Sequence, residues 1–245
     1  FVPNNTVLAI VGNLPVDEME ARVREVFADV PRGEDPPPPP EFARPPSKTV
    51  EIERELDISE AYLFVGVLGP DYNDPGQYAA DVLTQILGQG IHPMMTVALK
   101  NSRRAGVNSA HLSYIALKRA GAFVAYITLE PSKISVAKRE TITFLKGVRR
   151  ENFSPQDVLI EDRAAAFDLL ESAKNKIRFL GQQAWESGLG LASSMAAHML
   201  LAGTESEIDY LERIAAVTSG DLRKAAGASF NRDAFVIVSI VTRKK

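Results

Sequence analysis

Residues Phe1 to Phe27 are FVPNNTVLAIVGNLPVDEMEARVREVF, and they set the first expectation for the fold. The apolar run from Thr6 to Val11 predicts a buried strand, which a Gly-Asn break separates from an amphipathic helix. The apolar side chains of that helix recur at three- and four-residue spacing, at Val16, Met19, Val23, Val26 and Phe27. Free chain ends are normally loose and polar, whereas this end is apolar and regular. We therefore expect residues 1–30 to be the last strand and helix of a preceding half-domain.

A proline-rich segment follows at residues 31–47 and includes five consecutive prolines, Pro36 to Pro40. Such a run favours the extended polyproline II conformation, which makes a stiff spacer. The same run would also suit a partner that binds polyproline II segments. Apolar, periodic segments on both sides favour the spacer. We therefore expect a linker here and a second domain over residues 48–245.

The second domain is predicted to mix strands and helices. The expected strands are Thr49–Asp57, Ala61–Leu68, Val107–Leu117, Ala122–Leu129 and Ala234–Val241. Ala61–Leu68 is almost wholly apolar, which predicts a central strand covered on both faces. The expected helices span Asp74 to Gly88, Pro93–Arg103, Pro131–Arg149, Ser154 to Leu180 with Gly181 as its stop, Gln182–Leu201, Glu205–Val217 and Thr218–Phe230. Strands that meet in hairpins and helices that occur in runs indicate an α+β fold.

The end of the chain has an internal echo of its beginning. FNRDAFVIVSI, from Phe230, has the same order of aromatic residue, polar corner and apolar strand as FVPNNTVLAIV, from Phe1. A protein built from two related halves would end each half alike. Chance similarity between two buried strands is the competing explanation.

Three segments in this order resemble the pitrilysin/insulinase family of zinc metallopeptidases, which includes proteins like the mitochondrial processing peptidase. The first follows the family pattern YxPNNxxLxxxGD, with matches at Phe1, Pro3, Asn4, Asn5, Leu8 and Gly12 and with Asn13 where Asp is usual. The others are LTQILGQGI (Leu83–Ile91) and YLERIAAVTSGDLRKAA (Tyr210–Ala226). The resemblance implies the second-half, non-catalytic domain of such a peptidase. Its implied fold is a mostly antiparallel sheet of about five or six strands with helices packed mainly on one side.

Composition narrows the classes of function. A net charge of −3 gives no basic surface of the kind that binds nucleic acid. The absence of cysteine excludes disulfides and thiol catalysis but leaves the compartment open, so that a bacterial periplasm and a cytoplasm are both compatible. The longest apolar run, Leu189 to Ala202, is too short to span a bilayer.

The residues that zinc peptidases of this family need are absent from the chain. Their HxxEH motif places two zinc-binding histidines on one helix face beside a glutamate that acts as general base. The three histidines, His92, His111 and His198, do not have this spacing, and we predict no metal ligands and no catalytic residues here. The cluster Glu161, Asp162 and Arg163 has a solvated helix face as its simplest explanation.

The resemblance also implies two substrate-clamping residues in active relatives, an Arg at a helix start and a Tyr in a strand. Met94 stands at the position of that Arg and Asn108 at the position of that Tyr. Methionine has neither the charge nor the fork of donors that arginine offers, and asparagine lacks the ring. Substrate turnover by this chain alone is therefore not expected, and we name no confident substrate-binding residue.

Two functions remain open. In the first, the chain assembles with a zinc-bearing half or subunit, as a homo- or hetero-oligomer, and the zinc belongs to that partner while both enclose an extended peptide. In the second, it is a structural homologue with no peptide role, like the core subunits of the respiratory cytochrome reductase. An HxxEH motif earlier in the full-length protein would make the parent protein itself the protease.

Overall fold

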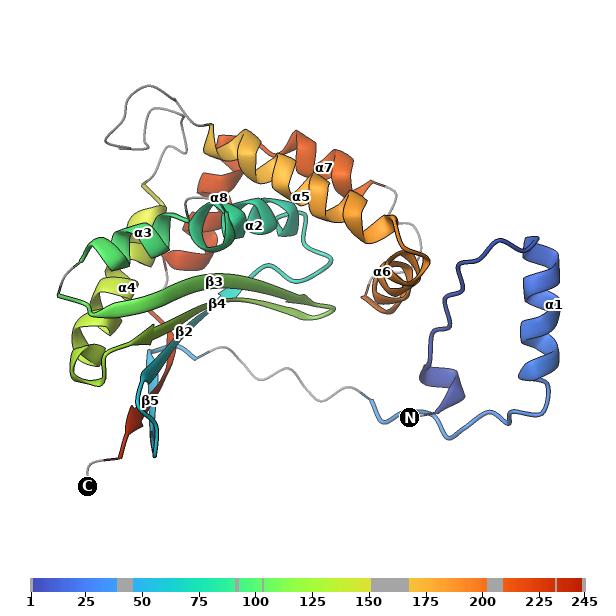
Figure 1. The fold of residues 1–245 in the computed structure, drawn as a ribbon, viewed down its shortest axis with the longest axis horizontal. Coiled ribbons are helices and arrows are strands. Elements are labelled where there is room, and N and C mark those ends of the chain that lie inside the picture. Colours follow the sequence, from blue (N-terminus) through green and yellow to red (C-terminus); the bar gives the residue numbers. More distant parts are fainter. Residues whose placement is uncertain are drawn as a thin grey trace. The chain divides into compact units, whose positions relative to one another are not determined.

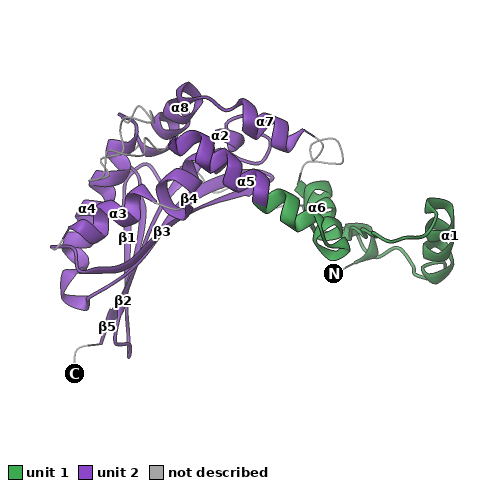
Figure 2. Ribbon diagram, turned by 45° about the horizontal axis from the view of Figure 1, so that its top comes forward, with its two compact units in different colours: residues 1–43, 180–208 green, residues 44–179, 209–245 purple. Residues whose placement is uncertain are grey.

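The computed structural model describes residues 2–38, 46–90, 93–102, 104–150, 168–201, 209–231 and 233–243. The chain divides into two compact units, shown in Figure 2. The smaller unit comprises residues 1–43 and 180–208, and the larger comprises residues 44–179 and 209–245. The division predicted from sequence, with a linker at residues 31–47, stays a prediction.

The larger unit contains one five-stranded sheet. Its strands are β1 (Val50–Leu56), β2 (Ala61–Gly69), β3 (Val107–Leu117), β4 (Ala120–Leu129) and β5 (Val236–Thr242). Their order across the sheet is β1-β5-β2-β4-β3, and β2 is therefore central. The β1–β5 pair is parallel, whereas β5–β2, β2–β4 and β4–β3 are antiparallel. The predicted α+β class and mostly antiparallel sheet are confirmed.

The other regular elements of the described chain are helices (Figure 1). In the larger unit they are α2 (Gln77–Thr84), η2 (Gln85–Gln89), α3 (Met94–Asn101), η3 (Pro131–Lys133), α4 (Ile134–Val148), α7 (Tyr210–Ala216) and α8 (Ser219–Phe230). The smaller unit contains η1 (Pro3–Asn5), α1 (Val16–Val26) and α6 (Gly188–Leu201). Helix α5 (Leu169–Trp185) runs across the boundary between residues 179 and 180.

The central strand β2 shows that helices cover only one face of the sheet. Ala61, Leu63, Val65 and Val67 alternate along it as buried side chains, and the residues between them are only half-buried. Figure 1 shows the helices of the larger unit on one side of the strands. The prediction that this strand is covered on both faces is wrong. The residues on its second face are apolar although no helix of the described chain packs on them.

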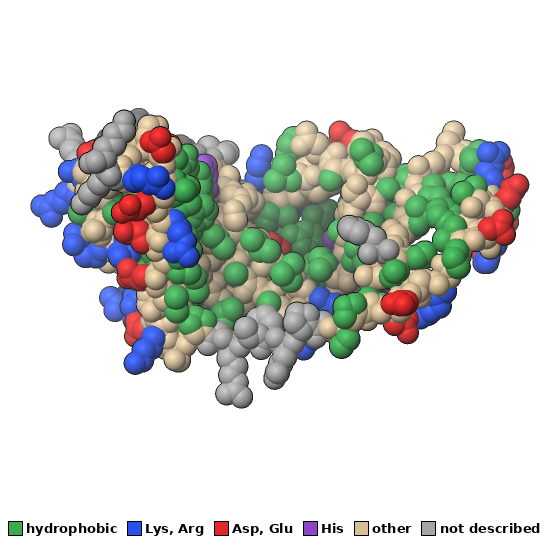
Figure 3. Space-filling model, turned by 90° about the horizontal axis from the view of Figure 1, so that it is seen from below, with side chains coloured by type: hydrophobic (Ala, Val, Ile, Leu, Met, Phe, Trp, Pro, Cys, Tyr) green, Lys and Arg blue, Asp and Glu red, His purple; other side chains and the backbone are tan. Residues whose placement is uncertain are grey.

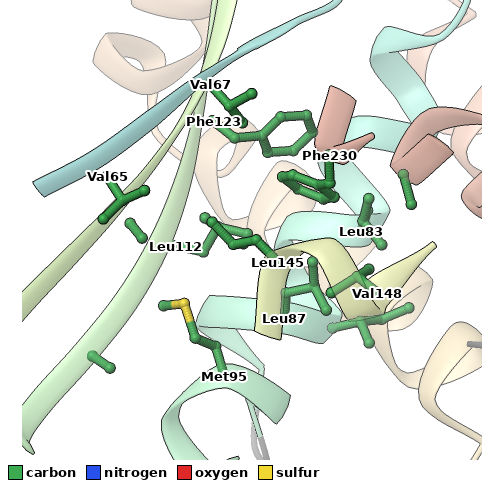
Figure 4. Close-up of a cluster of buried hydrophobic side chains, with 14 of the residues drawn as sticks. Val65, Val67, Leu83, Leu87, Met95, Leu112, Phe123, Leu145, Val148 and Phe230 are labelled. Carbon is green, nitrogen blue, oxygen red and sulfur yellow. The ribbon is translucent and has the colours of Figure 1, made fainter. Parts of the chain in front are cut away.

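The core lies between the sheet and the helices. The rings of Phe123 (β4) and Phe230 (α8) pack with their centroids 5.0 Å apart, and both side chains are fully buried. Figure 4 shows Met95, Leu112 and Leu145 in the same cluster, contributed by α3, β3 and α4. Each buried side chain of this size stabilises the fold by roughly 1.5–3 kcal/mol. The helix layer is thus held to one face of the sheet by hydrophobic packing.

Sequence signals predicted the start of the last helix and failed at three other places. Thr218 caps α8 as predicted: its hydroxyl accepts from the Asp221 N–H at 3.2 Å, and Asp221 Oδ2 accepts from the Thr218 N–H at 3.0 Å. Gly88 does not end a helix but lies inside η2, and α5 runs through Gly181 to Trp185. Among the described residues Gly106 is the glycine with positive φ, so neither predicted stop adopts the left-handed conformation of a glycine cap.

The third failure is the opening strand. Thr6 to Val11 forms no strand among the described residues, and Leu8 and Ile10 are 55% and 47% exposed. An apolar run becomes a strand only when a neighbouring strand pairs with its backbone. The helix that follows it, α1, is confirmed, whereas the start of the helix predicted from Ser154 lies outside the described residues.

Gly88 is required for close packing of η2 on β3. A Cβ atom built on Gly88 would lie 2.6 Å from Leu112 Cα, a contact that neither backbone can relieve easily. We expect Gly88→Ala to lower the free energy of unfolding by about 1–3 kcal/mol through overpacking. A Cβ atom added to Gly147 in α4 would meet no other part of the chain within 4 Å. Gly147→Ala should therefore raise the free energy of unfolding by about 0.5–1 kcal/mol. Urea unfolding of both variants measures the difference, and equal effects would contradict this role of Gly88.

Candidate functional site

Asn108, one of the two positions implied by the family resemblance, lies in a polar pocket at one end of the sheet. The pocket has a volume of about 470 Å³. Its lining residues are Ser59, Glu60, Lys100, Ser102, Gly106, Val107, Asn108, Leu129, Glu130 and Pro131. The Asn108 amide donates a hydrogen bond to the Glu60 carboxylate. The site therefore presents two carboxylates and one ammonium group instead of an aromatic ring.

Met94, the other implied position, does not line this pocket. It is the first residue of α3 and is half-buried against the core, whereas Lys100 at the other end of the helix reaches the pocket. The two residues are six positions apart, which is about 9 Å along a helix axis. The structure therefore does not bring Met94 and Asn108 into one pocket.

Sequence reasoning missed the two glutamates of this pocket, although strand pairing explains their meeting. Ala61 pairs with Leu129 across β2 and β4, so that Glu60 and Glu130 lie at the same end of the two strands. The sequence predicted that β3 and β4 pair as a hairpin, but it gave no register for β2 against β4. Nothing in the local sequence around Glu60 or Glu130 therefore singled them out.

The histidines do not form a metal site in the described part of the chain. His111 is exposed on β3, and His198 lies in α6 with its Nδ1 3.1 Å from the Ser194 carbonyl oxygen. His92 and the Glu161–Arg163 cluster lie outside the described residues. Residues 2–38, 46–90, 93–102, 104–150, 168–201, 209–231 and 233–243 contain no group of three or more His, Asp or Glu placed to hold a metal ion.

A second pocket, of about 620 Å³, lies among α2, α7, α8 and the end of β2. The Arg213 guanidinium stands over the Tyr78 ring at 5.5 Å, and both residues line the pocket. Close by, the Tyr210 hydroxyl donates to Asp81 Oδ2 at 2.9 Å and joins α7 to α2. Burial raises the pKa of Asp81 to about 6, and the bond from Tyr210 opposes part of that rise. The contact is structural, because it holds two helices together on the core side.

No helix in the described ranges is both long and apolar enough to cross a membrane.

Comparison with known proteins identifies the family. The sequence profile of the Peptidase M16 inactive domain matches residues 1–161. This match covers more than half of the 245 residues, and the chain belongs to this peptidase family, as its resemblance to pitrilysin/insulinase peptidases predicted. A comparison with curated proteins finds none that matches.

Solved structures share the fold. A protease from Helicobacter pylori superposes with a TM-score of 0.78 at 17% identity, over 94% of this chain and 54% of that chain. A peptidase M16 inactive domain from Pseudomonas fluorescens superposes with a TM-score of 0.70 at 19% identity, over 96% of this chain and 52% of that chain. A chain of complex III2 from Candida albicans superposes with a TM-score of 0.71 at 16% identity, over 94% of this chain and 53% of that chain. The present chain thus spans about half the length of these chains.

The raised pKa of Asp81 gives stability a pH dependence that can be measured. The pKa of Asp81 is about 6 in the folded protein and 3.8 ordinarily, so the folded state favours the protonated carboxyl. The stability that this protonation contributes is complete below pH 3.8 and is lost as pH rises through 6. We expect Asp81→Asn to be more stable than the parent protein by up to about 3 kcal/mol at pH 7.5, and to lose that advantage near pH 4. Urea unfolding at both pH values measures it.

Tyr210→Phe is the control for this prediction. It removes the hydrogen bond that favours the charged form of Asp81, and the pH at which stability falls should therefore move upward. A gain in Asp81→Asn that is equal at pH 4 and pH 7.5 would exclude titration of Asp81 as its cause.

Proposed function

We propose that the chain is the non-catalytic domain of a pitrilysin/insulinase-like zinc metalloendopeptidase. It assembles with a zinc-bearing half or subunit, and the two together enclose and bind peptide substrates. The zinc and the general base belong to that partner, and this chain supplies surface. The observation that carries the proposal is the uncovered, apolar face of the sheet.

This helix-free face carries apolar side chains from all five strands. They are Val50, Ile52 and Leu56 from β1, Tyr62 and Phe64 from β2, Ile115 and Leu117 from β3, Val124 and Tyr126 from β4, and Val236, Val238 and Ile240 from β5. By strand alternation Arg54, His111 and Ser113 lie on the same face toward the two edges of the sheet. The Phe64 and Tyr126 ring centroids are 5.2 Å apart. In Figure 3 the molecule is seen from below and hydrophobic side chains gather on this side.

The helix-free face is hollowed across its three middle strands, toward the end where β4 and β5 begin. An apolar pocket of about 310 Å³ is lined by Phe64, Val124, Val236 and their neighbours on the sheet. Ile115 is 51% exposed and Val236 is 38% exposed, so the apolar surface extends beyond the hollow. Soluble proteins rarely leave contiguous apolar areas of this kind bare unless a partner covers them. This surface explains why β2 is apolar on both faces although helices cover one.

A second function has one specific observation in its favour. The chain of complex III2 from Candida albicans has the same fold at a TM-score of 0.71. A scaffolding homologue would use the helix-free face for a closed interface and would leave no space for peptide. Peptide binding by the assembled complex therefore separates the two functions.

The chain alone should neither hold stoichiometric zinc nor cleave peptides. The reasons are the missing HxxEH motif and the neutral Met94 and Asn108 at the positions of the family's substrate-clamping residues. Elemental analysis of the purified chain and digestion of a broad peptide mixture test this. Tightly bound zinc together with chelator-sensitive cleavage would contradict it.

Assembly should depend on the helix-free face. We expect Val236→Glu to abolish co-purification with an HxxEH-bearing half encoded in the same gene or beside it, because a charge would be buried at the interface. Val97→Glu is the matched control, since Val97 is 45% exposed on α3 in the helix layer. Equal loss of assembly in both variants, or in neither, would contradict this use of the face.

A further inference from the structure

The two edges of the sheet differ in whether their backbone is available to another strand. At the β3 edge, Thr96 Oγ1 donates to the Ala110 carbonyl at 2.5 Å, and Gln89 Nε2 donates to the Leu112 carbonyl at 3.2 Å. Gly88 packs directly against Leu112. Side chains of α3 and η2 therefore occupy the carbonyl groups that an added strand would use at β3.

The β1 edge is more open: among the described residues one side chain bonds to its outward carbonyls, that of Arg54 in β1 itself, whose Nη1 donates to the Glu53 carbonyl at 2.9 Å. All seven residues of β1 are exposed, and β5 is its strand neighbour. The Val50 N–H donates to the Phe235 carbonyl at 2.8 Å, and the Leu56 carbonyl accepts from the Arg243 N–H at 2.8 Å. Even-numbered residues of β1 thus direct their backbone groups toward β5. Backbone groups alternate along a strand, so those of Glu51, Glu53 and Glu55 point outward.

The same three residues form a row of carboxylates along the free edge. Lys138 of α4 binds Glu51 at 2.6 Å, which places this row on the helix side of the sheet. In the described ranges Lys138 is the cation that pairs with the row, and Glu53 and Glu55 are exposed. On the other side of β1, Val50, Ile52 and Leu56 continue the helix-free face, with Arg54 between Ile52 and Leu56.

A second copy of this chain does not fit the β1 edge. Any antiparallel pairing of β1 with itself that keeps the apolar side chains on one face sets the glutamates of one copy opposite those of the other. Like charges directly opposite each other destabilise a strand pair. The edge therefore selects a strand of different composition, with cations opposite the glutamates and apolar side chains between them.

We propose that β1 binds an extended peptide segment with Lys or Arg at every second position and apolar residues between them, as a sixth strand of the sheet. Backbone hydrogen bonds to Glu51, Glu53 and Glu55 hold the segment, which displaces the exposed Arg54 side chain from the Glu53 carbonyl. The carboxylates select the composition of the segment. This inference deepens the proposed function, because it names the edge and the class of peptide that the domain would hold. It does not require the zinc-bearing half.

Binding of synthetic peptides to the 245-residue chain tests the proposal. The probe is a seven-residue peptide that alternates Lys and Val, and its controls are the Glu/Val analogue and an isomer with the lysines adjacent to one another. We expect calorimetry to detect binding of the alternating Lys/Val peptide and of neither control. Methylation of the alternate backbone nitrogens on one edge of the peptide should abolish binding, and methylation on the other edge should not. Equal binding of all these peptides, or of none, would overturn the proposal.

Variants of β1 separate the backbone contribution from the charge. Glu53→Gln/Glu55→Gln should weaken binding of the Lys/Val peptide by about 2- to 30-fold, from two lost cross-strand charge pairs. Glu53→Lys/Glu55→Lys should transfer binding to the Glu/Val peptide. Glu53→Pro removes an outward N–H without touching the β5 ladder, and it should bind far less peptide than Glu53→Gln. An unchanged preference in the Lys variant would overturn the proposal.

The outcomes also separate this inference from the proposed function. If the Lys/Val peptide does not bind while the chain still assembles with the HxxEH-bearing half, the glutamates serve only to keep the edge unpaired and the β1 proposal fails alone. If the peptide binds and responds to the Glu53 and Glu55 variants while assembly fails, the proposed enclosure fails and the edge site stands. Val236→Glu, which lies on β5, is expected to affect assembly and to leave binding of the Lys/Val peptide unchanged.

Discussion

Hydrophobic packing between one face of the sheet and the helices determines the remaining features of the larger unit. Phe123, Phe230 and the aliphatic side chains around them fill this interface completely, and the helices that supply them all lie on the same side. The opposite face has no helix in the described chain, and its three middle strands still present Val, Ile, Phe and Tyr side chains. A sheet with two apolar faces and one helix layer has an unsatisfied surface, and burial of that surface is the free energy available for assembly.

Much of the fold was predictable because its signals are local. The strand β3 and the helix cap at Thr218 follow from a hairpin pattern and from one capping pair, and the structure has both. Gly88 and Gly181 were misread because a glycine ends a helix only where the backbone turns left-handed, and tertiary packing decides that. Thr6 to Val11 was misread because strand formation depends on a neighbouring strand and not only on apolar residues.

The candidate site was less predictable than the fold. The family resemblance pointed to Met94 and Asn108, yet the side chains that meet near Asn108 are Glu60, Glu130 and Lys100. Glu60 and Glu130 lie 70 positions apart in sequence, and only the register of β2 against β4 brings them together. The contrast between the two sheet edges was also invisible, since it depends on hydrogen bonds from Gln89 and Thr96 to the β3 backbone.

Chain connectivity explains why the edges differ. The segment η2–α3 precedes β3 in sequence and packs along its free side, where two polar side chains can reach the exposed carbonyls. Strand β1 lies beside the last strand of the chain, and α4 approaches it through Lys138. The surfaces that stabilise the domain are consequently distinct from the surfaces that the proposals assign to recognition. The helix side and the β3 edge are closed by the domain's own residues, while the helix-free face and the β1 edge are exposed in the described chain.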